Sequence, residues 1–338
     1  MSERRLCTRC VLPESEPEIR IGDDGRCSVC VEHDRAAAAA PPSVPQESDF
    51  LKMLKKHRGK SEHDCLVMCS GGKDSTSALY YMKKRYRMNP LAFTFDHGFE
   101  TDDALRNVRR AVEILDVDYL QYRSTFIHDM VSHLLETDSR AVICHLCSIW
   151  YMDLTFRIAA RFRIPIIIAG WTKGQSTDEG VMSKCACNVT DPEFLRMGEA
   201  TQAFLDRLGD LPKYRDFPRS MEEVLRRARK RFKSVVLSPH WFLPTEADEY
   251  VRMLGRELGW EYPRESYPAK STNCLLNFVS VHNSMKHFGY THYHVEMSKL
   301  IRQGMMTRKE ALELLEIDFD VPFLNSIVEK LGHTFPDE

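Results

Sequence analysis

The sequence predicts an α/β protein built on a doubly wound parallel sheet, preceded by a four-cysteine segment and followed by a mainly helical region. Short apolar runs alternate with amphipathic helical patterns from residue 48 onward, which is typical of a parallel sheet covered on both faces. The string SGGKDS stands where one apolar run passes into a helical pattern. The predicted parts are a knuckle at 1–35, a linker at 36–47, a main domain at 48–190 and a C-terminal region at 191–338.

The first part is a predicted zinc-binding knuckle. Cys7 and Cys10 form one Cys-x-x-Cys pair, Cys27 and Cys30 form a second, and the turn-forming string GDDG lies between them. Four thiolates at this spacing can surround one zinc ion tetrahedrally, and closed four-cysteine sites of this kind are structural. The alternative is four unrelated thiols. A bound ion would hold together a segment too small to form its own core.

The linker and the main domain are predicted from the change in sequence pattern after the knuckle. An alanine run ends at Pro41 and Pro42, and no apolar periodicity crosses it, so we expect no continuous helix there. Ligands of a doubly wound sheet bind at the carboxyl ends of its strands. The predicted strands are 65–69, 91–96, 117–123 and 164–170, and the predicted helices are 50–57, 76–86, 102–115, 126–136 and 149–162.

The loop at 70–75 is a predicted phosphate site. The first turn of a helix leaves backbone N–H groups unpaired and carries the positive end of the helix dipole. Gly71 and Gly72 allow a close approach to a phosphate, Ser70 and Ser75 can donate hydroxyl groups, and Lys73 adds a positive charge. The alternative is a plain glycine turn before a helix.

Composition sets limits on the class of protein. The 338 residues carry a formal charge of -2 with 43% hydrophobic content. This charge argues against a protein that binds nucleic acid over most of its surface, but it is compatible with a local basic surface such as residues 221–233. No run of about 18 apolar residues occurs, and Met1 to Arg5 leads into cysteines rather than an apolar signal core. We therefore expect a soluble cytoplasmic protein without a membrane partner. Its 11 cysteines are then expected to be metal ligands or reactive thiols rather than disulfides.

SGGKDS is not a Walker A loop but resembles the PP-loop of the N-type ATP pyrophosphatases. The resemblance implies a Rossmann-like, adenine nucleotide alpha hydrolase-like fold that uses ATP and Mg²⁺, releases pyrophosphate and leaves AMP on a substrate oxygen. It implies that residues 70–75 hold the phosphates and that Lys73 and Asp74 are catalytic. It further implies nucleotide contacts at Asp96 and Gly170.

The same resemblance implies a loop near residue 170 that closes over the nucleotide. Asp178, with Glu179 beside it, is the expected catalytic carboxylate there, either holding Mg²⁺ or handling a proton. The alternative for these two residues is a solvated acidic loop. For His97, a capping or packing role is as well supported as a role as a catalytic base, and we do not assign it as a base.

The cysteines after residue 140 bear on which nucleophile the protein uses. Cys144 and Cys147 form a further Cys-x-x-Cys pair just before a predicted helix, and Cys274 follows far along the chain. This pattern is similar to that of PP-loop sulfurtransferases, which hold a [4Fe-4S] cluster by three thiolates and can carry sulfide on the open iron. In that resemblance Cys185 and Cys187 are substitute ligands, with Cys187 also a catalytic persulfide carrier. The alternative is that these are buried small apolar side chains.

A longer resemblance covers nearly the whole chain. The knuckle, the SGGKDS loop and the tail HVEMSKLIRQGMMTRKEALELL at 294–315 together resemble the N-acetyl sugar amidotransferase family of surface-polysaccharide pathways. That family implies activation of an acetamido carbonyl by ATP and replacement of its oxygen by ammonia, which a separate glutaminase delivers. Ammonia transfer has no obvious need for the cysteines after residue 140.

The sequence thus predicts adenylation of a carbonyl oxygen, with release of AMP and pyrophosphate, followed by replacement of that oxygen. We favour sulfur as the nucleophile, keep the ammonia-dependent amidotransferase as the alternative, and keep a non-catalytic nucleotide-binding zinc adaptor as a second alternative. Expected partners are a small-molecule or sugar acceptor rather than tRNA, a glutaminase or sulfur-donor protein, and a second copy in a homodimer. The tail adds one structural feature, a capping box from Thr307 to Glu310.

Overall fold

The computed structural model describes residues 4–39, 46–172, 192–232, 234–243, 246–271 and 273–336. Its centre is a five-stranded parallel sheet in the order β3-β2-β1-β4-β5. The strands are β1 (Cys65–Met68), β2 (Pro90–Asp96), β3 (Asp118–Arg123), β4 (Ile166–Ile168) and β5 (Val235–Leu237). The chain therefore reverses its winding direction at β1, between β2 and β4, and this is the switch point where doubly wound sheets bind ligands.

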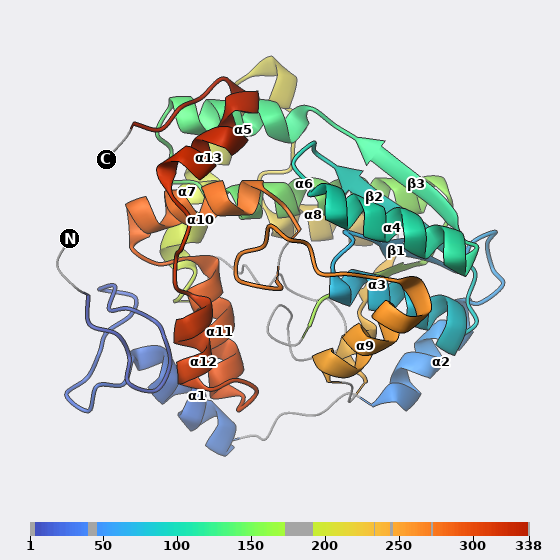
Figure 1. Cartoon of the computed structure of the whole chain (residues 1–338), viewed down its shortest axis with the longest axis horizontal. Helices are drawn as coiled ribbons and strands as arrows, with labels where there is room; N and C mark the ends of the chain where they lie inside the picture. The colour runs from blue at the N-terminus through green and yellow to red at the C-terminus, as the bar shows by residue number, and fades with distance from the viewer. Residues whose placement is uncertain are drawn as a thin grey trace.

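Helices cover both faces of this sheet and extend beyond it (Figure 1). The helices are α1 (Ser28–Ala39), α2 (Glu47–His57), α3 (Lys73–Tyr80), α4 (Asp102–Leu115), α5 (Phe126–Glu136), α6 (Ile143–Arg161), α7 (Leu195–Leu208), α8 (Met221–Arg227), α9 (Ala247–Leu258), α10 (Leu276–Phe288), α11 (His292–Arg302), α12 (Arg308–Leu314) and α13 (Val321–Val328). The predicted fold class, a doubly wound parallel sheet with a four-cysteine segment and a helical C-terminal region, is confirmed.

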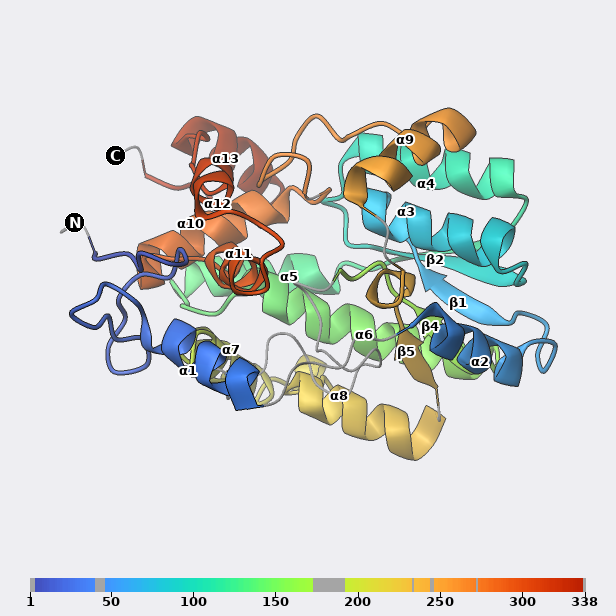
Figure 2. The ribbon, with the colours of Figure 1, turned by 90° about the horizontal axis from the view of Figure 1, so that it is seen from below.

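Alternate residues of each strand face opposite layers, as the period of two in a strand requires. Leu66 and Ile167 pack with α5, α6 and α8. Val67 and Ile168 pack with α2, α3, α4 and α9 on the other face. Figure 2 shows these two helical layers above and below the sheet.

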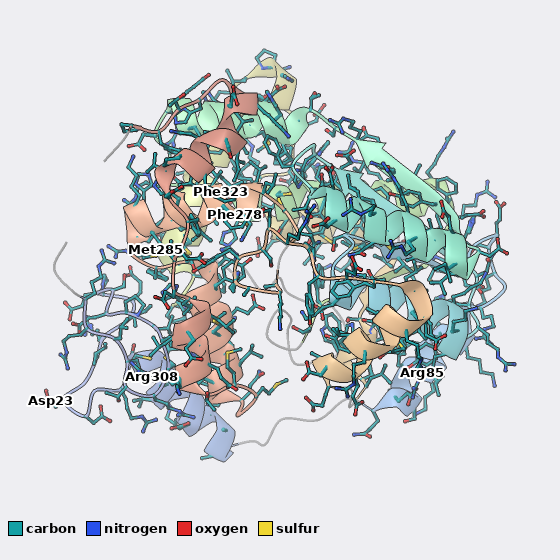
Figure 3. The ribbon with its side chains drawn as sticks, viewed as in Figure 1. Asp23, Arg85, Phe278, Met285, Arg308 and Phe323 are labelled. Atoms are coloured by element: carbon teal, nitrogen blue, oxygen red, sulfur yellow. The ribbon has the colours of Figure 1, made fainter. Side chains whose placement is uncertain are left out.

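The four-cysteine segment and the C-terminal helices pack on one another beside the sheet. The buried cysteines share a core with Phe288 of α10 and Val295 of α11, and Arg308 donates from Nε to the carbonyl oxygens of Cys7 and Cys10, each at 3.0 Å. Arg308 lies at this junction in Figure 3. The segment is thus joined to the rest of the molecule by contacts distant in sequence.

The C-terminal helices α10 and α13 pack through aromatic side chains. Phe278 and Phe323 meet edge to face, with ring centroids 5.0 Å apart (Figure 3), which is a favourable arrangement for aromatic pairs. The predicted capping box is confirmed, because Thr307 Oγ1 accepts from the Glu310 amide at 3.2 Å and Glu310 Oε2 accepts from the Thr307 amide at 2.8 Å. This box starts α12 as predicted.

Three predicted helix starts are wrong. The helix predicted at 50–57 begins at Glu47. The helix after the glycine-rich loop begins at Lys73 rather than at residue 76, so Lys73, Asp74 and Ser75 belong to its first turn. The helix after the third Cys-x-x-Cys pair begins at Ile143 rather than at residue 149, so that pair lies inside the helix. No helix within the described residues is long and apolar enough to cross a membrane.

Candidate active site

The glycine-rich loop joins β1 to α3 at the switch point of the sheet. Gly71 has φ +81°, and a Cβ built on it would stand 2.1 Å from the carbonyl oxygen of Ala104, so only glycine fits there. Ser75 Oγ accepts from the Ser70 amide at 3.2 Å and donates to the Gly72 carbonyl at 3.2 Å. No side chain caps the start of α3 at Gly72, which leaves first-turn N–H groups available to an anion.

The strand β4 approaches this loop closely from the other side of the switch point. A Cβ on Gly170 would stand 2.4 Å from the backbone nitrogen of Ser75. Glycine is therefore required at residue 170, which the PP-loop resemblance assigns to the nucleotide site. The close approach holds the end of β4 against the first turn of α3.

Asp74 is held by groups from several elements. Lys73 Nζ lies 2.8 Å from Asp74 Oδ2, and the hydroxyl of Tyr250 on α9 donates to Asp74 Oδ1. His240 Nε2 lies 3.0 Å from the Asp74 carbonyl oxygen. The carboxylate is thus fixed in place, and one of its partners lies 176 residues away in the chain.

The loop backbone is held in the same way. Trp260 Nε1 donates to the Gly71 carbonyl at 2.8 Å, and Asn273 Nδ2 donates to the Ser70 carbonyl at 2.8 Å. Trp260 stands near no recognisable motif, and Asn273, although it precedes Cys274, was not singled out from the sequence. The second half of the chain therefore completes the loop.

A cavity of about 360 Å³ opens at the carboxyl edge of the sheet, and eight of the predicted site residues line it. Its predicted lining residues are Ser70, Gly72, Asp74, Ser75, Cys144, Cys147, Gly170 and Cys274. Side chains that the sequence did not single out complete it, including Phe95, Glu100, Tyr151, Trp171 and His292. Its described lining contains two carboxyl groups and neither lysine nor arginine.

Asp96 does not line this cavity. Its Oδ1 accepts from the Gly98 amide at 2.8 Å, and its Oδ2 accepts from Gln121 at 2.8 Å and from Arg123 at 3.0 Å. Burial by itself would raise the pKa of Asp96, but these hydrogen bonds and the Arg123 charge hold the pKa below its usual value. Asp96 therefore fixes the end of β2, while Phe95 and His97 face the cavity.

The third Cys-x-x-Cys pair and Cys274 share this cavity although they come from distant segments. Cys144 and Cys147 lie on one face of α6, and an antiparallel bridge between Glu100 and Cys274 brings the last cysteine to the end of β2. Burial raises the pKa of Cys144 to about 11. Burial, followed by the charge of Glu100 and the other thiols, raises the pKa values of Cys147 and Cys274 well above the usual value.

Metal binding by these thiols would require loss of their protons, because the thiolate is the ligand form. Their sulfur atoms do not all lie within 4.8 Å of one another, unlike those of the N-terminal group. The three thiols therefore do not form a closed ion site like the N-terminal one. Cysteine thiolates are the ligands of iron–sulfur clusters, so the donor set that these residues bring to the cavity fits a [4Fe-4S] cluster.

His97 and Glu100 form a buried pair beside Cys274. His97 Nε2 lies 3.1 Å from Glu100 Oε1 and 3.6 Å from Cys274 Sγ. Burial lowers the pKa of His97 to about 4 and raises the pKa of Glu100 to about 7. Sequence reasoning left His97 unassigned and missed Glu100, although both belong to the string FDHGFE at the end of a predicted strand.

The N-terminal cysteines form a separate site. The sulfur atoms of Cys7, Cys10, Cys27 and Cys30 all lie within 4.8 Å of one another, and all four residues are fully buried. Cys7 and Cys30 are separated by 4.0 Å and Cys10 and Cys27 by 3.7 Å. A tetrahedral ion with metal–sulfur bonds of about 2.3 Å requires sulfur separations of this size, so the group fits one zinc ion.

Four predicted site residues, Asp178, Glu179, Cys185 and Cys187, lie outside the described residues.

The C-terminal segment matches a known family model. Residues 272–335 match the LPS biosynthesis protein WbpG-like, C-terminal domain. This segment contains the 294–315 tail, so the resemblance to a surface-polysaccharide family is confirmed for that part of the chain. Asn273 and Cys274, which contact the loop and line the cavity, fall inside the same match.

The full chain is also similar to other proteins. It is 22% identical over 268 residues to the uncharacterized protein MJ1599 of Methanocaldococcus jannaschii, which covers 79% of this chain and 77% of the relative. Among solved structures, the U34-tRNA thiolase NcsA from Methanococcus maripaludis, with its [4Fe-4S] cluster, is similar with a TM-score of 0.37 and 15% identity, over 94% of this chain and 90% of that chain. The NMN synthetase from Francisella tularensis has a TM-score of 0.38 and 11% identity, over 86% and 97%. All these TM-scores are below 0.5, so the fold class stands on the sheet order and the loop geometry described above.

Proposed function

We propose that this protein is a PP-loop ATP pyrophosphatase that adenylates a carbonyl oxygen of an acceptor and then replaces that oxygen. The observation that carries the proposal is the uncapped first turn of α3, which opens with Asp74 into a cavity within the size range of small-molecule sites. An adenylated carbonyl is an activated group because AMP is a good leaving group.

The loop residues have distinct roles in the first step. Backbone N–H groups of the first turn and the hydroxyls of Ser70 and Ser75 bind the phosphates, since an anion is favoured at a helix N-terminus. Asp74 is positioned by Tyr250 and Lys73 and is suited to hold Mg²⁺, whose preferred ligands are carboxylate oxygens. The acceptor oxygen forms a bond to the α-phosphorus, and the bond from that phosphorus to pyrophosphate breaks.

A sulfur species is the nucleophile that we propose for the second step. Three cysteines from two distant segments reach the cavity that holds the loop, and thiolates are the ligands of iron–sulfur clusters. When bound, such a cluster supplies an iron without a protein ligand, where a sulfur species can be held. Ammonia transfer gives no reason for three thiols in this cavity.

An ammonia-dependent N-acetyl sugar amidotransferase is the second candidate. The match of residues 272–335 to a lipopolysaccharide-biosynthesis family favours it. In both candidates the first step is the same. Only the incoming atom differs.

The test compares wild type, Asp74→Asn and the triple Cys144, Cys147, Cys274→Ser variant, purified without oxygen. AMP and pyrophosphate are measured with UDP-linked N-acetyl sugars or unmodified tRNA as acceptors, and sulfide or ammonium as nucleophile. We expect Asp74→Asn to abolish pyrophosphate release, and the triple variant to retain it while losing the iron and the sulfur-containing product.

Each other outcome rejects one part of the proposal. Formation of ADP and phosphate would reject the pyrophosphatase assignment. ATP binding without any pyrophosphate release would favour a non-catalytic adaptor. Ammonium-dependent turnover by the triple variant would reject sulfur and favour the amidotransferase.

A further inference from the structure

A second, smaller cavity lies next to the reaction cavity, on the neighbouring face of α6. It has a volume of about 30 Å³ and is enclosed by α6, α7 and the start of α8. Helix α8 lies on the side of α6 away from α3 and α4 (Figure 2). A space of this size holds one or two molecules no larger than water, so neither a nucleotide nor a sugar fits.

The two cavities share a wall residue. Ser148 lines both of them, because it lies on α6 between the face that carries Cys144 and Cys147 and the face that carries His145. Its hydroxyl donates to the Cys144 carbonyl at 2.8 Å. A small molecule in the second cavity is therefore separated from the reaction cavity by one small side chain.

His145 gives the second cavity a polar group that the protein itself leaves unpaired. The side chain is only 6% exposed, it lines the cavity, and its Nε2 has no hydrogen-bond partner. A buried polar atom without a partner is costly. His145 therefore places an unpaired polar atom, itself buried, beside this cavity.

The side chains that line the second cavity differ in exposure from its outer end to its inner end. Glu222 is exposed, and Gln202 and Arg219 are half-buried, whereas His145 and Thr201 are buried. The cavity therefore leads from the protein surface inward to Ser148. Its inner end is separated from the reaction cavity by Ser148, and the phosphate-binding loop does not line it.

We propose that this second cavity is the access route for the nucleophile, a small neutral hydride that is either ammonia or hydrogen sulfide. The inference rests on the proposed function and adds the path by which the second reactant arrives once ATP and the acceptor fill the main cavity. The nitrogen or sulfur atom forms a bond to the adenylated carbon, the bond from that carbon to the AMP oxygen breaks, and AMP leaves with the electron pair. The proton of the nucleophile passes to water.

The test uses two variants, Gln202→Trp and Glu222→Trp. Each places a bulky side chain at the outer end of the second cavity and so narrows the access route. Ala203→Trp is the matched control, since Ala203 is an exposed neighbour on the same helix that does not line the cavity. Rates of AMP, pyrophosphate and final product formation are measured with an acceptor that wild type turns over, at increasing ammonium or sulfide. The two nucleophiles are assayed separately.

We expect both route variants to raise the KM for the nucleophile about tenfold, which corresponds to about 1.4 kcal/mol. Pyrophosphate release at saturating acceptor should match wild type, which also shows that the variants fold, and more AMP should form without product as water captures the adenylate. Equal nucleophile KM values in Gln202→Trp, Glu222→Trp and Ala203→Trp would overturn the route alone. Absence of AMP and pyrophosphate in wild type would overturn the proposed function instead.

Discussion

At the residue scale, the position of Asp74 depends on side chains that no local pattern connects to it. The carboxylate receives a hydrogen bond from Tyr250 on α9 and lies 2.8 Å from Lys73 Nζ. Tyr250 is itself largely buried, and burial raises the pKa of its hydroxyl well above the usual value, so it remains a hydrogen-bond donor at any physiological pH. Its role is to position Asp74.

Replacing Tyr250 by phenylalanine tests this role. Tyr250→Phe removes only the hydroxyl, so Asp74 gains freedom to turn away from the phosphates, and we expect kcat for pyrophosphate release to fall about tenfold. The KM for ATP and the melting temperature should change little, because the ring still packs. Tyr122→Phe is the control, since Tyr122 is 41% exposed on β3. An unchanged kcat in Tyr250→Phe would show that Asp74 needs no such support.

The same residues show what the sequence can and cannot predict. Ser70 to Ser75 are adjacent in the chain, so their motif and the strand–helix junction could be predicted together. Tyr250, Trp260 and Asn273 approach the loop only because the chain returns after β5, and a contact between residues so far apart leaves no periodic or spacing signal. Gly170 was assigned by resemblance, and its packing against Ser75 gives the physical reason for glycine there.

At the element scale, the helix starts were the least predictable feature. Residues 73–75 carry no apolar periodicity, so pattern reasoning placed the start at residue 76, whereas Asp74 in the first turn complements the helix dipole. In α6, cysteine and histidine have modest helix propensity, and it is the packing of Ile143 and Leu146 in the main core that extends the helix over the Cys-x-x-Cys pair. Tertiary packing therefore explains the earlier start of α6, and the helix dipole explains that of α3.

The start of α11 gives a prediction at this scale. His294 Nδ1 accepts from the Thr291 amide at 3.2 Å, closing a capping box with histidine in its third position, and burial lowers the pKa of His294 to about 4. The unfolded chain binds a proton near pH 6.5 and the folded chain only near pH 4, so folding stability falls as the pH decreases through this window.

His294→Gln keeps an acceptor at the capping position but cannot be protonated. We expect urea unfolding of the variant to show a pH dependence between 6.5 and 4 that is shallower than that of wild type by up to about 1.4 kcal/mol per pH unit. At pH 8 the two proteins should have similar stability. Parallel stability curves across the whole range would contradict the assignment of a neutral buried His294.

At the scale of the whole molecule, the N-terminal knuckle is connected to the candidate active site. Its four cysteines share a core with Val142, the residue before α6, and Cys144 packs against that same core. Val11 donates from its amide to Ser298 Oγ at 3.3 Å on α11, which places the knuckle against both α6 and the C-terminal helices. The metal site therefore supports the end of α6 that carries the cysteines of the reaction cavity.

Removal of the N-terminal metal should consequently affect both stability and chemistry. Cys27→Ser breaks a closed four-thiolate site, so we expect bound zinc to fall from about one equivalent to none. The melting temperature should fall by on the order of 5 °C. The rate of product formation should also fall, because the start of α6 is less well fixed. Zinc and iron counts, thermal unfolding and turnover of the variant provide the measurements.

Cys65→Ser is the matched control, because Cys65 is fully buried in β1 and lies outside the knuckle. This variant should retain zinc even if the buried hydroxyl group lowers its stability. Purified wild-type protein without zinc would reject the knuckle assignment, and a zinc-free Cys27→Ser protein with undiminished turnover would reject the connection between the two sites.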